Sequence, residues 1–410
     1  MKEFSPFIIV AASDSKQKDS CGVDFVCTGK NDELTIQKAI EACVEQDKSI
    51  YLLNGTYHID DFYDFGDGGP KAAVCFPGNF RETTVIGQTF SFGKNRPGVT
   101  FYVSKEALDK VGEGEYDVIR TKWAKWGILN GTILKLENMQ IVLSHNQTPI
   151  RCIDLRRCDR VEMKNVRVLA YADTEGALGQ PPAIAVKGCI GVTMTDGSNN
   201  FIVRYDNVVA HGFYEGIQVG GEHVVMVDCA AVYCYYGYTF GNYPLNNGLN
   251  HPITMINCCD ERNVNLPLFN QCGDEVKGGG KRLLGGQEVT MISFNIERVE
   301  KQTPGGKLGD CMREVVPGTF CGRIEYTLQP DWNHTNEVHC QLWENDCSGK
   351  GFRTVNMTHK AVCSTADRKS YYPALGQQIF DTDLQKLLTC VDPKTKKWVD
   401  ANGVDPDVLS

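Results

Sequence analysis

Two acidic residues occupy equivalent places in two repeated segments of the chain, and their spacing suits acid–base chemistry on a glycosidic bond. Asp173 and Glu215 each lie eight residues after an asparagine that ends an alternating apolar stripe. If the two repeats stack as neighbouring strands about 4.8 Å apart, the carboxyl groups lie roughly 5 Å apart. Retaining glycosidases need two carboxyl groups at about 5 to 5.5 Å, one as nucleophile and one as acid/base. The pair predicts this chemistry, with Glu222 as a reserve acid, although two stacked acids also occur on solvated faces.

Polar and aromatic side chains surround these acids in the same repeats. In segments such as Ile217-Gln218-Val219, the flanking apolar residues are predicted to point inward, so the middle residue points outward. Aromatic rings stack on the C–H surfaces of sugars, while amides and carboxylates bind the hydroxyl groups. For His211 a packed structural role is the alternative. The predicted sugar-binding residues on this face are Asp154, His211, Tyr214, Gln218, Tyr236 and Asn242.

Asp260 breaks a column that is otherwise apolar. The equivalent positions in other repeats hold Ile141, Val168 and Ala210, which are predicted to point inward. An acid at such a position indicates either a local bulge or a perturbed carboxyl group near a site. We therefore include Asp260 among the predicted substrate-binding residues.

The chain offers no strong motif for a metal or cofactor. The stretch from Asp60 to Asp67 is rich in oxygen ligands, but it lacks the spacing and the distal Glu of a calcium loop, so a solvated turn is favoured. We find no phosphate-binding loop and no dinucleotide fingerprint. The sequence therefore predicts neither a metal site nor a cofactor.

Six segments that position these residues align column by column. Each has two alternating apolar residues followed by a small polar residue, after which the apolar parity shifts by one. Such a break in a period-two stripe predicts two short strands joined by a bend, because Asn and Asp tolerate bend conformations. The shortest interval, from Asn207 to Asp228, is 21 residues, a length typical of stacked single-turn repeats. The predicted bend residues are Asn138, Asn165, Asn207, Asp228, Asn257 and Ser293.

The segment before the repeats predicts a cap. Residues 31–46 begin with Asn31-Asp32 as a helix N-cap and place Ile36, Ile40 and Cys43 on one face, and residues 49–59 predict two strands around a turn. A helix at this point would cover the exposed edge of a stack of strands.

Here the chain resembles a known superfamily. Residues 23–33 with this helix, then Ile50-Tyr-Leu-Leu-Asn-Gly-Thr-Tyr, resemble the entry segment of right-handed parallel β-helix proteins of the pectate-lyase-like superfamily, and Thr84-Val-Ile-Gly-Gln-Thr resembles the next coil. The resemblance covers roughly residues 20–300 and is specific for fold. It implies an all-β right-handed parallel β-helix that handles carbohydrate, as do the glycoside hydrolases, lyases, epimerases and phage tailspikes of that superfamily. Lacto-N-biosidase-like and inulin-fructotransferase-like hydrolases share the architecture, but no catalytic string matches.

Three regions follow from this pattern. Residues 1–50 are predicted to form an N-terminal strand and capping helix, 51–300 the parallel β-helix core, and 301–410 irregular final coils with a C-terminal cap, because the columns fade in the last region.

The net charge and the cysteines limit which partners and which cellular compartment are expected. The net charge of -9 argues against nucleic acid or an anionic membrane as partner, since both reward clustered Lys and Arg. The apolar run near the N-terminus is too short for a membrane span. The 18 cysteines include no C-x-x-C pair, and several fall in the inward columns, which favours a reducing cytoplasm.

These observations favour an intracellular glycoside hydrolase, or an intramolecular glycosyl transferase, that acts on a small oligosaccharide. A polysaccharide lyase or epimerase is the alternative. It would need a cation against a uronate, and the face offers only Arg151 and Arg167 nearby. A non-catalytic, tailspike-like carbohydrate-binding protein is a third hypothesis, and a homo-oligomer such as a trimer stays open.

Overall fold

The structure is a computed structural model of the whole chain. It describes residues 5–78, 82–90, 98–123, 133–158, 160–170, 184–193, 202–220, 223–240, 253–261, 263, 268–269, 287–297, 320–329, 338–345, 352–353, 362–370, 376, 378–392 and 394–407.

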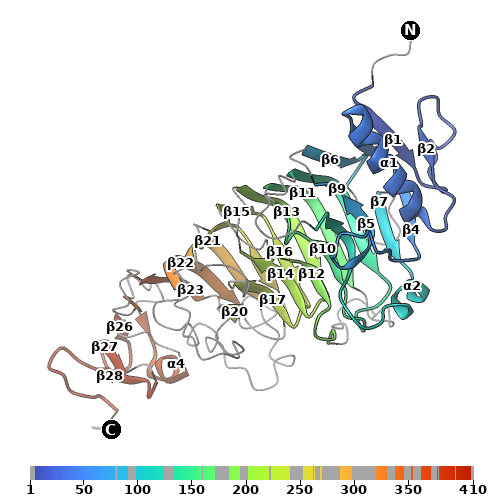
Figure 1. Cartoon of the computed structure of the whole chain (residues 1–410). Helices are drawn as coiled ribbons and strands as arrows, with labels where there is room; N and C mark the ends of the chain where they lie inside the picture. The colour runs from blue at the N-terminus through green and yellow to red at the C-terminus, as the bar shows by residue number, and fades with distance from the viewer. Residues whose placement is uncertain are drawn as a thin grey trace.

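Most of the described strands belong to two long sheets, in which strands from successive repeats pair in parallel (Figure 1). Sheet A contains β1 (Phe7–Ala11), β2 (Phe25–Val26), β3 (Ser49–Leu52), β4 (Gly55–Ile59), β6 (Glu82–Gly87), β7 (Val99–Val103), β9 (Ile133–Leu143), β11 (Arg160–Ala170), β13 (Ile202–His211), β15 (Val224–Val227), β16 (Ala230–Val232), β18 (Ile253–Ile256), β19 (Cys259–Glu261), β21 (Gln287–Glu297) and β22 (Phe320–Gln329), followed by antiparallel β23 (Val338–Asn345) and β24 (Phe352–Arg353). Sheet B runs in spatial order through β5 (Lys71–Phe76), β8 (Tyr116–Thr121), β10 (Arg151–Asp154), β12 (Ile190–Val192), β14 (Glu215–Val219), β17 (Tyr236–Phe240) and β20 (Leu268–Phe269).

The predicted bend residues adopt the left-handed conformation that a bend requires. Asn165 in β11 and Asn207 in β13 both have φ of 53°, and the other four predicted bend residues have φ between 53° and 56°. Asn and Asp enter this region more readily than other residues with a Cβ. The amides also stack, because Asn165 Nδ2 donates to Asn138 Oδ1 at 2.9 Å and Asn207 Nδ2 donates to Asn165 Oδ1 at 2.9 Å. The prediction of six aligned bends is therefore confirmed.

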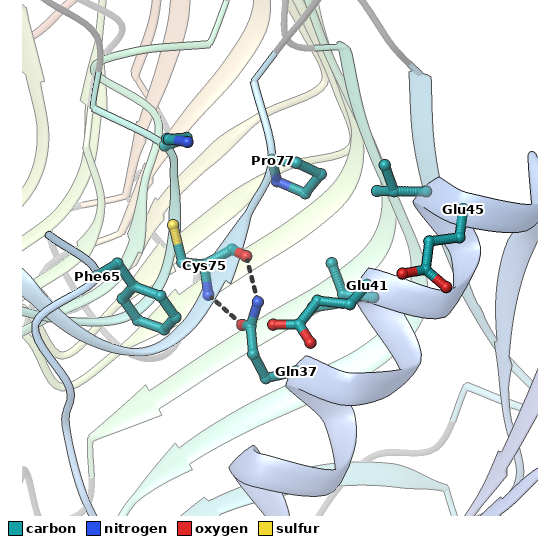
Figure 2. Close-up of a pocket in the computed structure, with 9 residues that line it drawn as sticks. Gln37, Glu41, Glu45, Phe65, Cys75 and Pro77 are labelled. Carbon is teal, nitrogen blue, oxygen red and sulfur yellow. Dashed lines mark hydrogen bonds between the residues drawn. The ribbon is translucent and has the colours of Figure 1, made fainter. Parts of the chain in front are cut away.

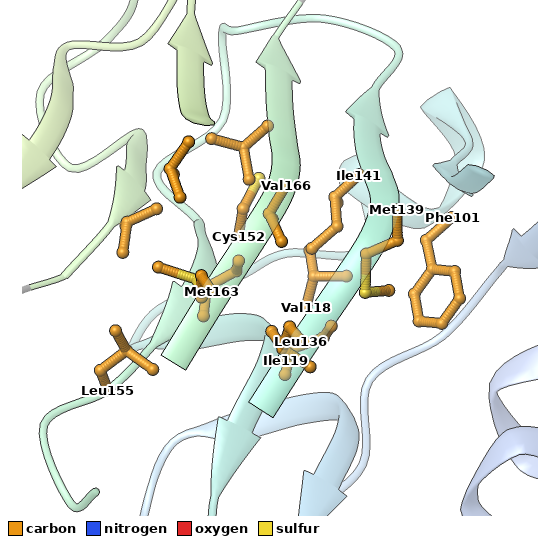
Figure 3. Close-up of a cluster of buried hydrophobic side chains, with 14 of the residues drawn as sticks. Phe101, Val118, Ile119, Leu136, Met139, Ile141, Cys152, Leu155, Met163 and Val166 are labelled. Carbon is orange, nitrogen blue, oxygen red and sulfur yellow. The ribbon is translucent and has the colours of Figure 1, made fainter. Parts of the chain in front are cut away.

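The alternating apolar residues of the repeats form one continuous core between the sheets. Figure 3 shows side chains of β9 and β11, such as Leu136, Ile141 and Met163, together with Ile119 of β8 and Cys152 of β10. Each of these five is at most 1% exposed. Burial of such side chains stabilises a fold by roughly 25 cal/mol per Å² of apolar surface, so the stacking of repeats provides the main stabilisation.

The first helix, α1 (Asp32–Gln46), buries Ile36, Ile40 and Cys43 as predicted. Its N-terminus differs from the prediction. Asn31 has φ of 47° and its side chain makes no capping hydrogen bond. The Asp32 carboxylate accepts instead from the backbone N–H groups of Thr28, Gly29 and His58, so this carboxylate ties the helix to the preceding loop and to β4.

The remaining described elements lie after β4 and near the C-terminus. A short helix, α2 (Lys105–Asp109), follows β7. Near the C-terminus, α4 (Thr365–Ser370) lies beside a small sheet of β25 (Val362–Cys363), β26 (Gln378–Asp381), β27 (Lys386–Asp392) and β28 (Lys397–Val399). This sheet has a separate apolar cluster around the fully buried Trp398.

The structure confirms the coarser part of the fold prediction, because its described residues form mostly β-strands in long parallel sheets, and it is compatible with an all-β fold and with the predicted solenoid. Within the described residues, no helix has the length and apolar character that crossing a membrane requires.

Candidate functional site

The candidate site lies on the outer face of sheet B, on strand β14. Glu215 and Gln218 point outward, while Gly216 and Ile217 between them both face the core. Ile217 is fully buried, and a Cβ on Gly216 would lie 3.0 Å from Cys234 Sγ and 2.7 Å from the carbonyl oxygen of Gly237. With two consecutive inward residues between them, Glu215 and Gln218 lie on the same outer face and their side chains meet. Glycine is required at position 216 because a Cβ there would be too close to the neighbouring backbone.

Glu215 is held by two hydrogen bonds to the same carboxylate oxygen. Gln218 Nε2 donates to Glu215 Oε2 at 2.8 Å, and Thr239 Oγ1 donates to the same atom at 3.0 Å. Thr239 belongs to β17, where it is in register with Gln218. Glu215 is half-buried, whereas both donors are buried, so fixed donors orient a carboxylate that still reaches the surface.

Three tyrosine rings form a corner next to this carboxylate. Tyr214 and Tyr235 stack with ring centroids 4.6 Å apart and planes within 9°. The Tyr236 ring is perpendicular to Tyr235, at 4.9 Å and 90°, and stands edge-on to Tyr214. All three are half-buried, so the rings offer both apolar surface and hydroxyl groups. Burial, with the Tyr235 and Glu215 groups nearby, raises the pKa of Tyr214, whose hydroxyl therefore stays protonated at neutral pH.

The structure brings together four of the predicted site residues: Glu215, Gln218, Tyr214 and Tyr236. Tyr236 faces Glu215 in register on the neighbouring strand. Three others, Asp173, Glu222 and Asn242, lie outside the described residues. The residue that faces Glu215 on the preceding strand β12 is Ile190, so the predicted register of Asp173 with Glu215 is not the one the strands adopt, and the carboxylate pair stays a prediction. The sequence-based site omitted Thr239, although its alignment with Gln218 in the outward column was the available signal.

Asp154 is the last residue of β10 in sheet B. Its side chain is only 2% exposed, whereas the sequence predicted an outward position open to sugar. Its carboxylate accepts from Arg156 Nε and Nη2 at 2.9 and 2.8 Å and from Thr193 Oγ1 at 3.1 Å. Burial alone would raise the pKa of Asp154, but the charge and hydrogen bonds of Arg156 outweigh it and hold that pKa below its ordinary value. The carboxylate is thus engaged within the protein, and its role toward sugar stays a prediction.

Opposite charges also face one another on the two neighbouring strands. Asp117 faces Arg151, and Arg120 faces Asp154, in the paired strands β8 and β10. Arg151 Nε pairs with Asp117, and its Nη1 lies 2.7 Å from Glu115 Oε1. Burial and the Asp154 charge raise the pKa of Asp117, against the attraction of Arg151. The signal in the sequence was an acid and an arginine three residues apart in both strands, in reverse order.

His211 lies in sheet A, on β13, and not on the outer face of sheet B that carries Glu215. Its ring is tilted against Tyr233 with centroids 5.3 Å apart. Burial, together with the nearby Arg167 charge, lowers the pKa of His211 to about 4. The imidazole is therefore neutral at neutral pH, in the packed environment that was the alternative for this residue.

Asp260 points into the interior, on the side of β17 opposite to Glu215. It is 1% exposed, and a Cβ on Gly237 would lie 2.5 Å from Asp260 Oδ2 and 2.2 Å from Asn263 Nδ2. Tyr236, the neighbour of Gly237, is the residue that faces Glu215. Because successive side chains of a strand point to opposite faces, Asp260 and Glu215 are separated by the sheet. Its role toward substrate stays a prediction.

A pocket of about 320 Å³ lies between α1 and β5, at the far end of sheet B from β17. Figure 2 shows Glu41 and Glu45 on the helix side, Phe65 and Pro77 across from them, and the Gln37 amide bonded to Cys75. Gln37 Nε2 donates to the Cys75 carbonyl at 3.1 Å, and the Cys75 N–H donates to Gln37 Oε1 at 3.0 Å. Burial raises the pKa of the Cys75 thiol to about 12, so the thiol is protonated at neutral pH. The contacts at this pocket close the end of the sheet.

The oxygen-rich stretch after β4 uses its acids for the fold. Asp67 pairs with Arg120, and Asp61 with Lys110. Within the part of the chain that the structure describes, no three His, Cys, Asp or Glu side chains gather closely enough to hold a metal ion.

Comparisons with known proteins add little to this geometry. No family model matches the chain, and no curated protein matches it. A solved structure described as ORF18 of Geobacillus virus E2 aligns with 91% of this chain and 82% of its own, at 10% sequence identity and a TM-score of 0.30. A likeness at that level supports no conclusion about fold or function.

Proposed function

We propose that this chain is a right-handed parallel β-helix that acts as a glycoside hydrolase, or as an intramolecular glycosyl transferase, on a small oligosaccharide. The observation that supports it most is the half-buried Glu215, oriented by Gln218 and Thr239 beside three tyrosine rings. Aromatic faces and hydrogen-bonding groups around one carboxyl group are what a sugar subsite with a reacting carboxylate requires. The six aligned bends and the in-register strands support the β-helix.

In this proposal, Glu215 is one member of a carboxyl pair. Asp173 is the proposed partner, because it lies eight residues after its bend residue, as Glu215 does, and Glu222 is the reserve. In the paired strands, the residue of the preceding repeat that faces Glu215 is Ile190 and not Asp173. One carboxyl group attacks the anomeric carbon, or activates a water molecule that attacks it, and the other gives a proton to the leaving oxygen. Tyr214 and Tyr236 hold the sugar ring.

The test is substitution of Glu215 by Gln, which keeps the size of the side chain and removes its charge. Incubation with a panel of di- and oligosaccharides, followed by mass detection of products, identifies a substrate for the wild type. We expect E215Q to turn this substrate over at least a hundredfold more slowly, because general acid–base or nucleophilic catalysis is lost. Its melting temperature and circular dichroism should match those of the wild type.

A matched control is E137Q, since Glu137 lies on β9 in sheet A, away from the site. It should leave turnover unchanged. Unchanged turnover in E215Q would remove Glu215 from the mechanism, and absence of products with every sugar would remove the hydrolase itself.

A lyase or epimerase on uronates is the weaker proposal. It needs a cation against the substrate carboxylate, and Arg151 lies in the outward row of Glu215 with Ile190 between them. However, Arg151 pairs with Asp117 and Glu115 within the protein. Unsaturated products, seen as a rise in ultraviolet absorbance, would favour the lyase.

The proposal includes a reducing, cytoplasmic location and a neutral oligosaccharide as partner. It is supported by the twelve cysteines among the described residues, all of which are free thiols and eleven of which are buried or half-buried, and by the net charge of -9. A homo-oligomer such as a trimer stays a prediction that sedimentation velocity would decide.

A further inference from the structure

We propose that Gln218 and Thr239 are positioning residues for Glu215, and that their arrangement assigns Glu215 the role of nucleophile and not of acid. This inference rests on the proposed function, and it goes further by giving the two members of the carboxyl pair different roles. It also gives Gln218 a role other than direct binding of sugar.

The geometry concentrates both donors on one oxygen. Gln218 Nε2 and Thr239 Oγ1 both reach Glu215 Oε2, at 2.8 and 3.0 Å. Two donors directed at one oxygen suit a charged carboxylate, because hydrogen bonds to a charged group are stronger than those to a neutral one. The carboxylate plane is fixed by these bonds, so the direction of the second oxygen is fixed as well.

The donors themselves are immobilised by the fold. Gln218 is 6% exposed and Thr239 is fully buried. Gln218 reaches Glu215 because the two residues between them, Gly216 and Ile217, both face the core, and Thr239 is in register with Gln218 on the adjacent strand. Preorganised donors of this kind need no rearrangement when the reaction takes place.

Donors directed at a carboxylate oxygen suit a carboxylate that attacks the substrate as a nucleophile. In the first step a Glu215 oxygen forms a bond to the anomeric carbon, the bond from that carbon to the leaving oxygen breaks, and the second carboxylic acid gives its proton to that oxygen. In the second step water attacks the same carbon, loses a proton to the second carboxylate and releases Glu215. An acid in the role of Glu215 would instead have to hold and donate a proton.

Three variants test the positioning. T239V removes the hydroxyl while keeping the shape, Q218M removes the amide, and T239S keeps a hydroxyl. We expect T239V and Q218M to lower kcat at least tenfold and to move the acidic limb of the pH profile of kcat/KM to higher pH by about one unit, because a hydrogen bond to a charged group is lost. T239S should keep most of the wild-type kcat and leave the acidic limb close to its wild-type position.

T193V is the matched structural control. Thr193 is also a buried threonine near the same outward row, but its hydroxyl bonds to Asp154. T193V should lower the melting temperature and leave the acidic limb in place. Movement of the basic limb in T239V would instead assign Glu215 the role of acid and overturn the proposal.

A second measurement separates this inference from the proposed function. The carboxyl carbon of Glu215 can be titrated by ¹³C NMR in protein with labelled glutamate, with its resonance assigned by its absence in E215Q. A higher titration midpoint in T239V and Q218M, without turnover of any sugar, would leave the positioning intact and refute the hydrolase. An unchanged midpoint in both variants would refute the positioning.

Discussion

Asp67 illustrates how a single charged side chain becomes part of this fold. Arg120 donates to both of its oxygens, from Nη1 at 2.7 Å and from Nη2 at 2.8 Å, and the Trp123 N–H donates to Oδ2 at 2.8 Å. The Arg120 side chain is fully buried, and that of Asp67 is 3% exposed. A buried guanidinium without its carboxylate would be left uncompensated.

We expect D67N to lower the free energy of unfolding at neutral pH by about 3–5 kcal/mol, because it leaves the Arg120 charge buried without its partner. Burial would raise the pKa of Asp67, but the hydrogen bonds and charge of Arg120 outweigh it and lower that pKa. The wild type therefore has the full stabilisation above the unfolded pKa of about 3.9, and loses it as the pH falls toward the lower native value. D67N should lack this acid dependence.

Urea denaturation at neutral pH and at acidic pH values checks both statements. D64N in the same loop is the control, since Asp64 is exposed and its carboxylate accepts a hydrogen bond from the Gly66 N–H, at 2.8 Å. Equal stability of D67N and D64N at neutral pH would contradict the role of the pair.

The sequence alone could not distinguish these two acids. Both were expected in a solvated turn, which suits Asp64. The partner of Asp67 lies 53 residues later in the chain, and a turn motif carries no information about such a distant residue. The same limit applies at the candidate site. The sequence predicted that Gln218 lies on the same outer face as Glu215, but a repeat pattern carries no information about the hydrogen bonds that Gln218 and Thr239 donate to Glu215.

At the scale of the element, the bent strands are the feature that the sequence predicts best. The alternation of apolar residues and the asparagine that interrupts it are both local, so six bends could be predicted without any knowledge of partners. Asn165 combines two contributions, a left-handed backbone and two amide hydrogen bonds to its neighbours.

Two substitutions at Asn165 separate these contributions. N165A should lower the free energy of unfolding by about 2–4 kcal/mol, because it loses both hydrogen bonds and places alanine in a left-handed conformation. N165G also loses the hydrogen bonds but accepts the backbone, so we expect it to be about 1 kcal/mol more stable than N165A. Chemical denaturation of both variants provides the measurement, and N165G less stable than N165A would show that the backbone contributes little.

At the scale of the whole molecule, the stack of strands needs an end. Strand β5 is the last described strand of sheet B, and α1 lies against it (Figure 1). The Gln37 amide bonds to both the N–H and the carbonyl of Cys75, as a neighbouring strand would. An unpaired edge would otherwise be open to association with another chain.

We expect Q37A to lower the free energy of unfolding by about 1–3 kcal/mol, because two backbone groups of Cys75 lose their partners. It should also increase self-association, which light scattering over a range of concentrations would detect. K38A, at the next and exposed position of α1, is the control. A Q37A protein as stable and as monodisperse as K38A would show that the helix closes the sheet without this amide.

The matched register of β9, β11 and β13 bears on which changes of chain length the protein tolerates. Deleting one residue just before Asn165 would turn Val161 and Met163 toward water and bring Glu162 into the interior, since side chains alternate along a strand. Removing a block of residues between two strands leaves that alternation untouched. Insertions and deletions in related chains should therefore be confined to the connections between strands, where new side chains can change which ligand the outer face of a sheet binds.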